Sequence, residues 1–175
     1  MPQTLEGSCR CGAIRFSCDS HTPQPYQRCY CSICRKTAGG GGYAINLGAD
    51  ARTLKVAAGK AAAGKGATGQ DAKQVFRAEI MQDDGACRLS SAERHFCARC
   101  ATALWLFSPE WPELVHPFAS AVDSALPTPP ASVHIMLRFK PSWVEPQIGV
   151  NDAVFDLYPD ESIEAWHRKR GLWVD

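Results

Sequence analysis

Three cysteines fall within six residues in the stretch Cys29-Tyr-Cys-Ser-Ile-Cys-Arg-Lys36, and this stretch decides the fold. Two short-spaced pairs flank it along the chain, Cys9-x-Cys11 before it and Cys97-x2-Cys100 after it. One or two residues between cysteines let both sulfurs reach the same ion, and zinc binds such thiolates in tetrahedral geometry. The spacing therefore predicts that metal ions hold this fold together.

The seven clustered cysteines divide naturally into four and three. A structural zinc takes four protein ligands, whereas a catalytic zinc keeps one position open. The spacing does not dictate which groups share an ion, but joining the two pairs leaves the three-cysteine group intact. We therefore expect two zinc ions per chain. The alternative for Cys97-x2-Cys100 is a redox pair, which normally opens a helix in a βαβ unit, and no such alternation is present here.

The two remaining cysteines, Cys18 and Cys87, stand alone in the sequence. An isolated thiol usually behaves as a small apolar side chain, so we expect both to be buried. The alternatives are an additional metal ligand or an oxidant sensor.

The composition is that of one ordinary globular domain. The chain has 175 residues, of which 45% are hydrophobic and 21% charged, which excludes a disordered chain. The formal net charge of +1 offers no basic surface for nucleic acid or a membrane. The first ten residues hold no apolar signal segment, and no run approaches the ~18 apolar residues of a membrane span. We expect a soluble cytoplasmic protein, in which clustered cysteines stay reduced.

Short strand-like runs alternate with glycine and proline, which predicts a mainly β fold of small antiparallel sheets with minor helix. The predicted strands are Ala13–Ser17, Tyr43–Leu47, Thr53–Val56, Gln74–Ile80, Leu104–Phe107, Val115–Ala119 and Val133–Phe139. Two short helices are expected. One follows Cys31 through Lys36, and the other spans Glu161–Arg170, with Asp160 as its N-cap and Gly171 at its end.

Two glycine-rich stretches have alternative interpretations. Residues 57–73 lack core-forming side chains, and we expect a loop between strands. Within them, Gly59-x4-Gly64-Lys65 is close to a phosphate-binding loop, but Gly66 stands where that loop needs Ser or Thr for Mg²⁺. The four glycines at 39–42 fit either a flexible loop or a backbone packed closely beside a site.

Three motifs in this order resemble one known family. They are Gly7-Ser-Cys-Arg-Cys-Gly12, Cys29-Tyr-Cys-Ser-Ile-Cys-Arg-Lys36 and Arg94-His-Phe-Cys-Ala-Arg-Cys100. Together they resemble the glutathione-dependent formaldehyde-activating enzyme family, or CENP-V/GFA domain, over about residues 5–145. Two positions depart from the family pattern, because Tyr30 replaces a usual His and Ala101 replaces a common Gly.

The resemblance implies an Mss4-like β fold with two zinc ions. By motif, Cys9, Cys11, Cys97 and Cys100 would hold the structural ion, and Cys29, Cys31 and Cys34 the catalytic one. The implied activity is a carbon–sulfur lyase reaction on thiol–aldehyde adducts, in which glutathione and formaldehyde form S-hydroxymethylglutathione.

The ligand type suits that chemistry. Three thiolates weaken zinc as an activator of water but leave it able to bind a fourth thiol as a nucleophilic thiolate. Arg28, Arg35 and Lys36 flank the cluster and are candidates to bind glutathione carboxylates, the alternative being ordinary surface charges.

No residue stands out as a general acid or base. We expect His95 to lie near the structural zinc and His116 to be a structural histidine. The aromatic side chains Trp105, Phe107 and Trp111 are expected in the core and at its rim, with a substrate pocket wall as the alternative.

Two alternatives to the glutathione reaction remain at the level of sequence. One is a non-enzymatic zinc-stabilised interaction module, as the chromatin-associated branch of the family suggests, although the chain lacks that branch's basic arm. The other is an enzyme for a different thiol or aldehyde. We expect the zinc domain over residues 5–145 and a C-terminal extension with a short helix over 146–175.

Overall fold

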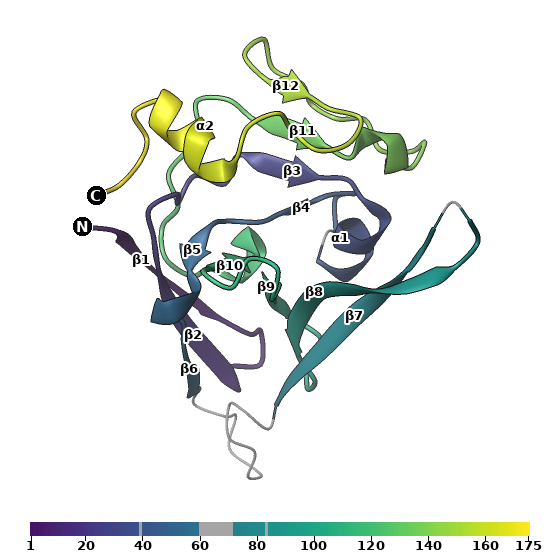
Figure 1. Ribbon diagram of the computed structural model, residues 1–175. Coiled ribbons are helices and arrows are strands. Elements are labelled where there is room, and N and C mark those ends of the chain that lie inside the picture. Colours follow the sequence, from purple (N-terminus) through teal and green to yellow (C-terminus); the bar gives the residue numbers. More distant parts are fainter. Residues whose placement is uncertain (39, 60–71, 83) are drawn as a thin grey trace.

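The computed structural model describes residues 1–38, 40–59, 72–82 and 84–175, and strands dominate its regular structure (Figure 1). Within these ranges the strands form three small sheets, and the helical segments are short. The prediction of a mainly β fold with minor helix is therefore confirmed. The predicted loop at 57–73 falls largely on residues 60–71, which lie outside the described residues, as does Gly39.

The first sheet is antiparallel, in the order β1-β2-β6. Its strands are β1 (Gln3–Ser8), β2 (Ile14–Ser20) and β6 (Lys55–Ala58). Alternate residues of β2, including Ile14, Phe16 and Cys18, point into the core, as period-two patterning requires. The Phe16 ring packs edge-on against Trp105 at 5.3 Å between centroids, which joins this sheet to the next.

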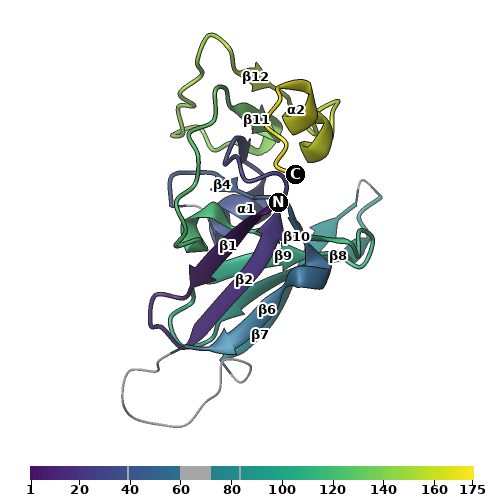
Figure 2. The same ribbon diagram turned by 90° about the vertical axis from the view of Figure 1, so that its left-hand side faces the viewer.

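The second sheet has five antiparallel strands in the order β5-β10-β9-β8-β7. They are β5 (Ala49–Asp50), β10 (Leu114–Pro117), β9 (Ala103–Phe107), β8 (Cys87–Cys97) and β7 (Lys73–Met81). The far half of the β7–β8 hairpin projects from the body of the molecule (Figure 1). In Figure 2, β1 and β2 of the first sheet lie in front of this sheet.

The third sheet, in the order β12-β11-β3-β4, carries the three-cysteine group. Its strands are β12 (Ala153–Val154), β11 (Val133–Ile135), β3 (Gln27–Cys29) and β4 (Ala44–Ile45). β11 pairs in parallel with both β3 and β12, so this sheet is mixed rather than wholly antiparallel. The predicted strand Val133–Phe139 is too long, because Met136 takes a left-handed φ of 62° and a 3-10 turn follows.

Two α-helices were expected, and both are present. Helix α1 spans Ser32–Thr37, and α2 spans Ile163–Lys169. The N-cap of α2 is Ser162, whose Oγ accepts a hydrogen bond from the Ala165 amide, so the prediction of Asp160 was wrong. Gly171 closes α2 with a φ of +65°, as expected. Three 3-10 turns complete the helical structure, η1 (Ala51–Thr53), η2 (Ala119–Ala121) and η3 (Leu137–Phe139).

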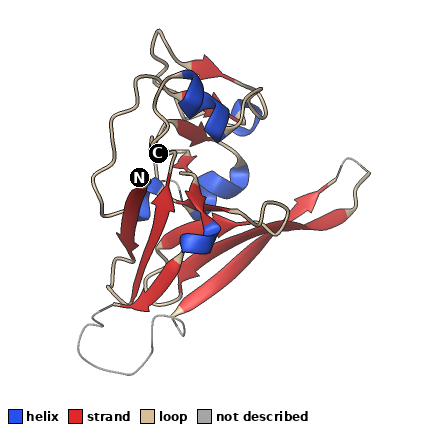
Figure 3. Cartoon of the chain, turned by 60° about the vertical axis from the view of Figure 1, so that its left-hand side comes forward, coloured by secondary structure: helices blue, strands red, loops and turns tan. Residues whose placement is uncertain are grey.

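Two hydrophobic clusters form the core, and each surrounds one cysteine group. The first joins the two antiparallel sheets and holds Cys9 and Cys97 among buried apolar side chains. The second lies under the mixed sheet and holds Cys29 and Cys34. Both α-helices lie in the half of the molecule that contains this sheet (Figure 3). The fold therefore builds a separate apolar surround for each candidate metal centre.

Candidate metal centres

The four-cysteine group joins the β1–β2 turn to the β8–β9 turn. Cys9 and Cys11 follow β1, Cys97 ends β8, and Cys100 lies in the turn before β9. Their sulfurs all lie within 4.8 Å of one another, with Cys9–Cys11 at 3.5 Å and Cys11–Cys97 at 3.7 Å. Tetrahedral zinc with Zn–S bonds of about 2.3 Å requires S–S separations of roughly 3.8 Å, whereas a disulfide needs about 2 Å. These four sulfurs are therefore spaced for one tetrahedral ion.

A left-handed residue closes each of these two turns. Gly12 has a φ of +73°, and its amide donates to the Cys9 carbonyl at 2.9 Å. Ala101 has a φ of +59°, and its amide donates to the Cys97 carbonyl at 2.7 Å. Both turns thus end at a left-handed residue, although the closing hydrogen bond reaches back three residues in the first and four in the second. Only the first uses glycine, the residue that adopts this conformation without strain.

The three-cysteine group lies where β3 meets α1. Cys29 ends β3, Cys31 is the N-cap of α1, and Cys34 lies in its first turn. The three sulfurs lie within 4.8 Å of one another, and the Cys34 amide donates to the Cys31 sulfur at 3.2 Å. Hydrogen bonds from the Cys29 and Cys34 side chains, and then from backbone amides, lower the pKa of Cys31. The hydrogen bonds that Cys29 makes with the Cys31 and Cys34 side chains raise the pKa of Cys29. Cys31 is therefore the sulfur that most readily carries negative charge.

Two polar side chains that the sequence did not single out border this group. Asn46 directs its side-chain nitrogen toward the Cys34 sulfur at 4.0 Å, and its Oδ1 is buried without a partner. Arg94 on β8 is only 7% exposed, and its Nε is also buried and unpartnered. Its positive charge acts to lower the pKa of Cys34.

Arg94 lacks the carboxylate that a buried arginine normally requires. Within the described ranges no Asp or Glu forms an ion pair with it, and its one hydrogen bond is to the Ala92 carbonyl at 3.4 Å. A buried charge without a partner is strongly destabilising. The negative charge available nearby is that of the cysteine thiolates. Arg94 therefore fits a counter-ion to an anionic three-thiolate centre.

The three predicted glutathione contacts lie around the cluster but differ in their surroundings. The Arg28 guanidinium lies 5.3 Å from the centre of the Tyr43 ring and donates weakly to the Gln147 carbonyl at 3.5 Å. Arg35 is half-buried, and Lys36 is exposed in the last turn of α1. Nothing in the structure tests their role, which stays a prediction.

The isolated cysteines behave differently from each other. Cys18 is buried as expected, and burial raises its pKa to about 12. Cys87 is exposed at the end of the β7–β8 hairpin, so the prediction that it is buried was wrong. The tertiary structure carries it away from the core because the hairpin projects. Neither residue belongs to a cysteine group of the described structure.

The histidine and aromatic residues named in the sequence analysis lie in the core or at its edge. His95 is buried and stacked on Trp105 at 5.1 Å, and burial lowers its pKa to about 4. His116 bonds the Leu47 carbonyl through Nδ1 at 3.0 Å, as a structural histidine should. Phe107 is half-buried and Trp111 largely exposed, in keeping with positions at the edge of the core.

A buried network that sequence reasoning missed lies beside the three-cysteine group. The Tyr30 hydroxyl bonds His134 Nδ1 at 2.9 Å, and His134 Nε2 bonds the Asp152 carboxylate at 3.2 Å. Although burial raises the pKa of Asp152, the amides of Ser132 and Gly149 lower it below its ordinary value. An ionised Asp152 accepts a hydrogen bond from the Nε2–H group of His134, so Nδ1 of His134 is the acceptor for the Tyr30 hydroxyl. Tyr30, which lies between two cysteines, is thereby fixed to β11 and to the extension.

The chain just before the extension packs closely on the glycine run. A Cβ added to Gly42 would lie 2.3 Å from the Val144 side chain, and Gly42 has a φ of +89°. Of the two interpretations of the glycine run, close packing therefore applies at Gly42. Gly40 meets no neighbour of this kind.

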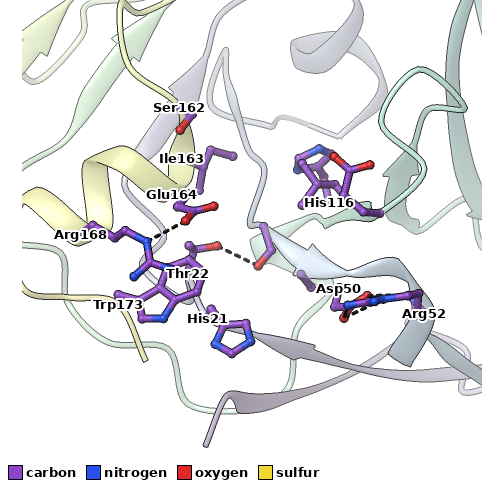
Figure 4. Close-up of a pocket in the computed structure, with 14 residues that line it drawn as sticks. His21, Thr22, Asp50, Arg52, His116, Ser162, Ile163, Glu164, Arg168 and Trp173 are labelled. Atoms are coloured by element: carbon purple, nitrogen blue, oxygen red, sulfur yellow. Dashed lines mark hydrogen bonds and ion pairs between the residues drawn. The ribbon is translucent and has the colours of Figure 1, made fainter. Parts of the chain in front are cut away.

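A cavity of about 540 Å³ lies between α2 and the β5–β10 edge (Figure 4). None of its lining residues is a cysteine. Four of its charged side chains are paired, with Arg168 bonded to Glu164 at 2.6 Å and Arg52 to Asp50 at 2.7 Å. His116 lines it as well. This cavity is therefore distinct from both candidate metal centres.

The comparisons with known proteins decide the family. The family model described as glutathione-dependent formaldehyde-activating enzyme matches residues 4–137. The chain belongs to this family. A Halomonas elongata protein, provisionally named glutathione-dependent formaldehyde-activating enzyme, is 57% identical over 168 residues, which cover 96% of this chain and 97% of the relative. A crystal structure of a Rhodobacter sphaeroides protein is similar over 70% of this chain and 91% of its own, at 19% identity and a TM-score of 0.45.

Both cysteine groups of this formaldehyde-activating family member lie inside the matched segment, whereas the extension follows it. Asp152 therefore reaches the three-cysteine surroundings from outside the family match. Across the described ranges, no helix has the length and apolar character needed to cross a membrane.

Proposed function

We propose that this chain is a zinc-dependent carbon–sulfur lyase that interconverts glutathione plus formaldehyde and S-hydroxymethylglutathione. The observation that carries the proposal is the three-cysteine group, which no fourth Cys, His, Asp or Glu of the described residues joins. A centre with three protein ligands retains a position for a substrate atom. We further propose that it works in the cytoplasm, where thiols stay reduced.

The donor set fits zinc at both groups. Thiolates are the ligands zinc takes in closed and open sites alike, and the measured sulfur separations suit it. At the three-cysteine group the charge also fits. Three thiolates and Zn²⁺ give a net charge of −1, which the buried Arg94 balances. We propose a structural ion at the four-cysteine group and a catalytic ion at the three-cysteine group.

The side chains of the site have different roles in the proposed reaction. Zinc, when bound, supplies the charge that keeps an incoming thiol deprotonated near neutral pH. Cys29, Cys31 and Cys34 hold the ion, and Arg94 neutralises the centre. We propose that Arg28, Arg35 and Lys36 bind the carboxylates of glutathione, because their positive charges lie around the cluster.

The reaction is an addition without oxidation or reduction. The glutathione sulfur attacks the formaldehyde carbon, an S–C bond forms, and the C=O π pair moves to oxygen. That oxygen takes up one proton, which replaces the proton lost by the thiol. The reverse reaction breaks the same bond.

Exchange NMR with ¹³C-formaldehyde and glutathione tests the proposal. We expect the zinc-loaded chain to raise the rate of exchange between free formaldehyde and S-hydroxymethylglutathione, and Cys34→Ser to abolish the acceleration. Cys87→Ser is the matched control, because Cys87 is exposed and outside both groups. An exchange rate equal to that without protein would overturn the activity and favour the interaction module.

A further inference from the structure

The middle of the extension is held along β11, the neighbour of the cysteine-bearing strand, by backbone hydrogen bonds. The Phe155 amide donates to the His134 carbonyl at 2.8 Å, and the Met136 amide donates to the Leu157 carbonyl at 2.8 Å. The segment that leads to Tyr158 therefore runs along β11 and past its end.

β11 is in turn the neighbour of the cysteine-bearing strand. Ile135 pairs with Cys29, and the Tyr30 amide donates to the Ile135 carbonyl at 3.0 Å. Tyr158 thus lies across one strand from the start of the cysteine loop, although 124 residues separate it from Cys34.

The Tyr158 side chain is both open and electrostatically coupled to the centre. Tyr158 is 74% exposed as a residue, so a ligand has access to it. Surrounding protein atoms, and then the charges of Cys29, Cys31 and Cys34, raise the pKa of its hydroxyl, while Arg94 acts in the opposite direction. The phenol therefore stays protonated near neutral pH and is a hydrogen-bond donor.

The other donors around the centre are either enclosed or, like Arg35 and Lys36, already proposed to bind the glutathione carboxylates. The Tyr30 hydroxyl is buried against His134, and Arg28 lies over Tyr43 and contacts Gln147. Arg94 is buried and fits the counter-ion role. Tyr158 combines an exposed side chain with a position one strand away from the cysteine-bearing strand β3.

We propose that the Tyr158 hydroxyl contacts the aldehyde-derived oxygen of the substrate and acts as its proton donor, an inference that rests on the proposed function. When the thiol sulfur bonds to the aldehyde carbon, the carbonyl oxygen gains an electron pair. Tyr158 stabilises that oxygen by a hydrogen bond and gives it the phenolic proton, and water restores the proton to Tyr158. In the reverse direction, the tyrosinate accepts the hydroxyl proton as the S–C bond breaks.

The first test is kinetic and uses the zinc-loaded full chain. Tyr158→Phe removes one oxygen, and we expect kcat to fall about 100-fold, the lower end for a general acid or an oxyanion donor. The Kd of glutathione, measured by calorimetry without formaldehyde, should stay within about twofold, because the proposed contact forms only with the aldehyde oxygen.

The second test observes the phenol directly. With ¹³Cζ-labelled tyrosine, the signal absent from Tyr158→Phe identifies Tyr158 among the four tyrosines. We expect this signal to shift when glutathione and formaldehyde are added together, and to move little with glutathione alone. If Tyr158 only held the extension in place, its signal would not move when glutathione and formaldehyde are added together.

Leu157→Ala is the matched control, because Leu157 is the neighbouring residue, is 41% exposed, and bonds Met136 only through its backbone. An equal loss of kcat in Leu157→Ala, or full activity in Tyr158→Phe, would overturn the role of Tyr158. Wild-type protein that binds zinc but does not accelerate exchange would instead refute the proposed function, so the two failures are distinguishable.

Discussion

At the scale of single residues, one of the two non-glycine residues with a positive φ in the described ranges lies in a turn of the four-cysteine group. Ala101 has a φ of +59° and is exposed, so its methyl group contributes strain without packing. A left-handed conformation costs a non-glycine residue about 1–2 kcal/mol, a cost that glycine avoids. Glycine in turn loses more chain entropy on folding than alanine, which offsets roughly 0.5–1 kcal/mol of this gain. The family's common glycine at this position therefore has a physical reason.

We expect Ala101→Gly to raise the free energy of unfolding by about 0.5–1 kcal/mol, measured by urea denaturation of the zinc-loaded protein. Ala98→Gly in the same turn is the control. Ala98 is exposed and has no positive φ, so glycine there should destabilise by a similar amount. Equal effects of the two substitutions would show that the strain at Ala101 has no energetic consequence.

Tyr30 shows how one departure from the family pattern is accommodated. Its buried hydroxyl donates to His134, whose other nitrogen is held by Asp152. Tyr30→Phe leaves the His134 acceptor unsatisfied, so we expect a loss of about 1–3 kcal/mol in the free energy of unfolding. Tyr26→Phe serves for comparison, because the Tyr26 hydroxyl makes only a 3.4 Å contact with Gln27. A loss no larger in Tyr30→Phe than in Tyr26→Phe would contradict the network.

At the scale of elements, α2 joins the extension to the core. Trp166 stacks on Tyr26 with 3.7 Å between ring centroids, and His167 is fully buried. His167 Nδ1 bonds the Ile163 carbonyl at 2.7 Å, while Nε2 accepts the Gln24 amide at 3.3 Å. Both ring nitrogens are therefore used by a neutral imidazole, and a second proton would break the bond to Gln24.

This arrangement predicts a pH dependence. Burial lowers the pKa of His167 below its ordinary 6.5, so as pH falls through 6.5 the unfolded chain binds a proton before the folded one does. Stability should therefore decrease with falling pH in this window. We expect urea midpoints at pH 7.5 and 5.5 to differ less in His167→Gln than in wild type, each measured zinc-loaded. An identical pH effect in both proteins would exclude His167 as a source.

At the scale of the whole molecule, the two metal centres should differ in their consequences for folding. The four-cysteine group ties the first sheet to the second, whereas the three-cysteine group is confined to one loop beside the mixed sheet. Because a closed site forms only in the folded chain, the free energy of binding its metal ion contributes directly to the stability of the fold. Loss of the four-cysteine ion should therefore affect the whole fold.

We expect two zinc ions per chain by elemental analysis of protein prepared without chelator. Cys100→Ser should lower the melting temperature strongly, and Cys34→Ser should remove about one ion while leaving the β-sheet circular dichroism intact. One ion or none in the wild-type protein would contradict the division into four and three. A more damaging effect of Cys34→Ser would reverse the assignment of the two centres.

Local patterns in the sequence were sufficient for the mainly β class, most central strands, both α-helices and the grouping of seven cysteines. These properties depend on short-range chemistry, such as alternation, capping and the reach of two sulfurs across a short turn. β8 was missed because Arg88-Leu-Ser-Ser-Ala-Glu-Arg-His-Phe96 lacks apolar alternation and β-branched residues, and it is a strand through its pairing with β7 and β9. The exposure of Cys87 follows from that same hairpin.

Only the tertiary structure brought Arg94, Asn46, Asp152 and Tyr158 to the surroundings of one cysteine loop. They come from four separate segments of the chain, and although Arg94 opens the third cysteine motif, nothing in that motif shows that its side chain lies at the other cysteine group. The cysteines could be found because their ligand geometry is local, encoded in spacings of one or two residues. The residues around them depend on strand order and on the parallel pairing of β11 with β3, and long-range pairings of this kind leave no periodic trace in the chain.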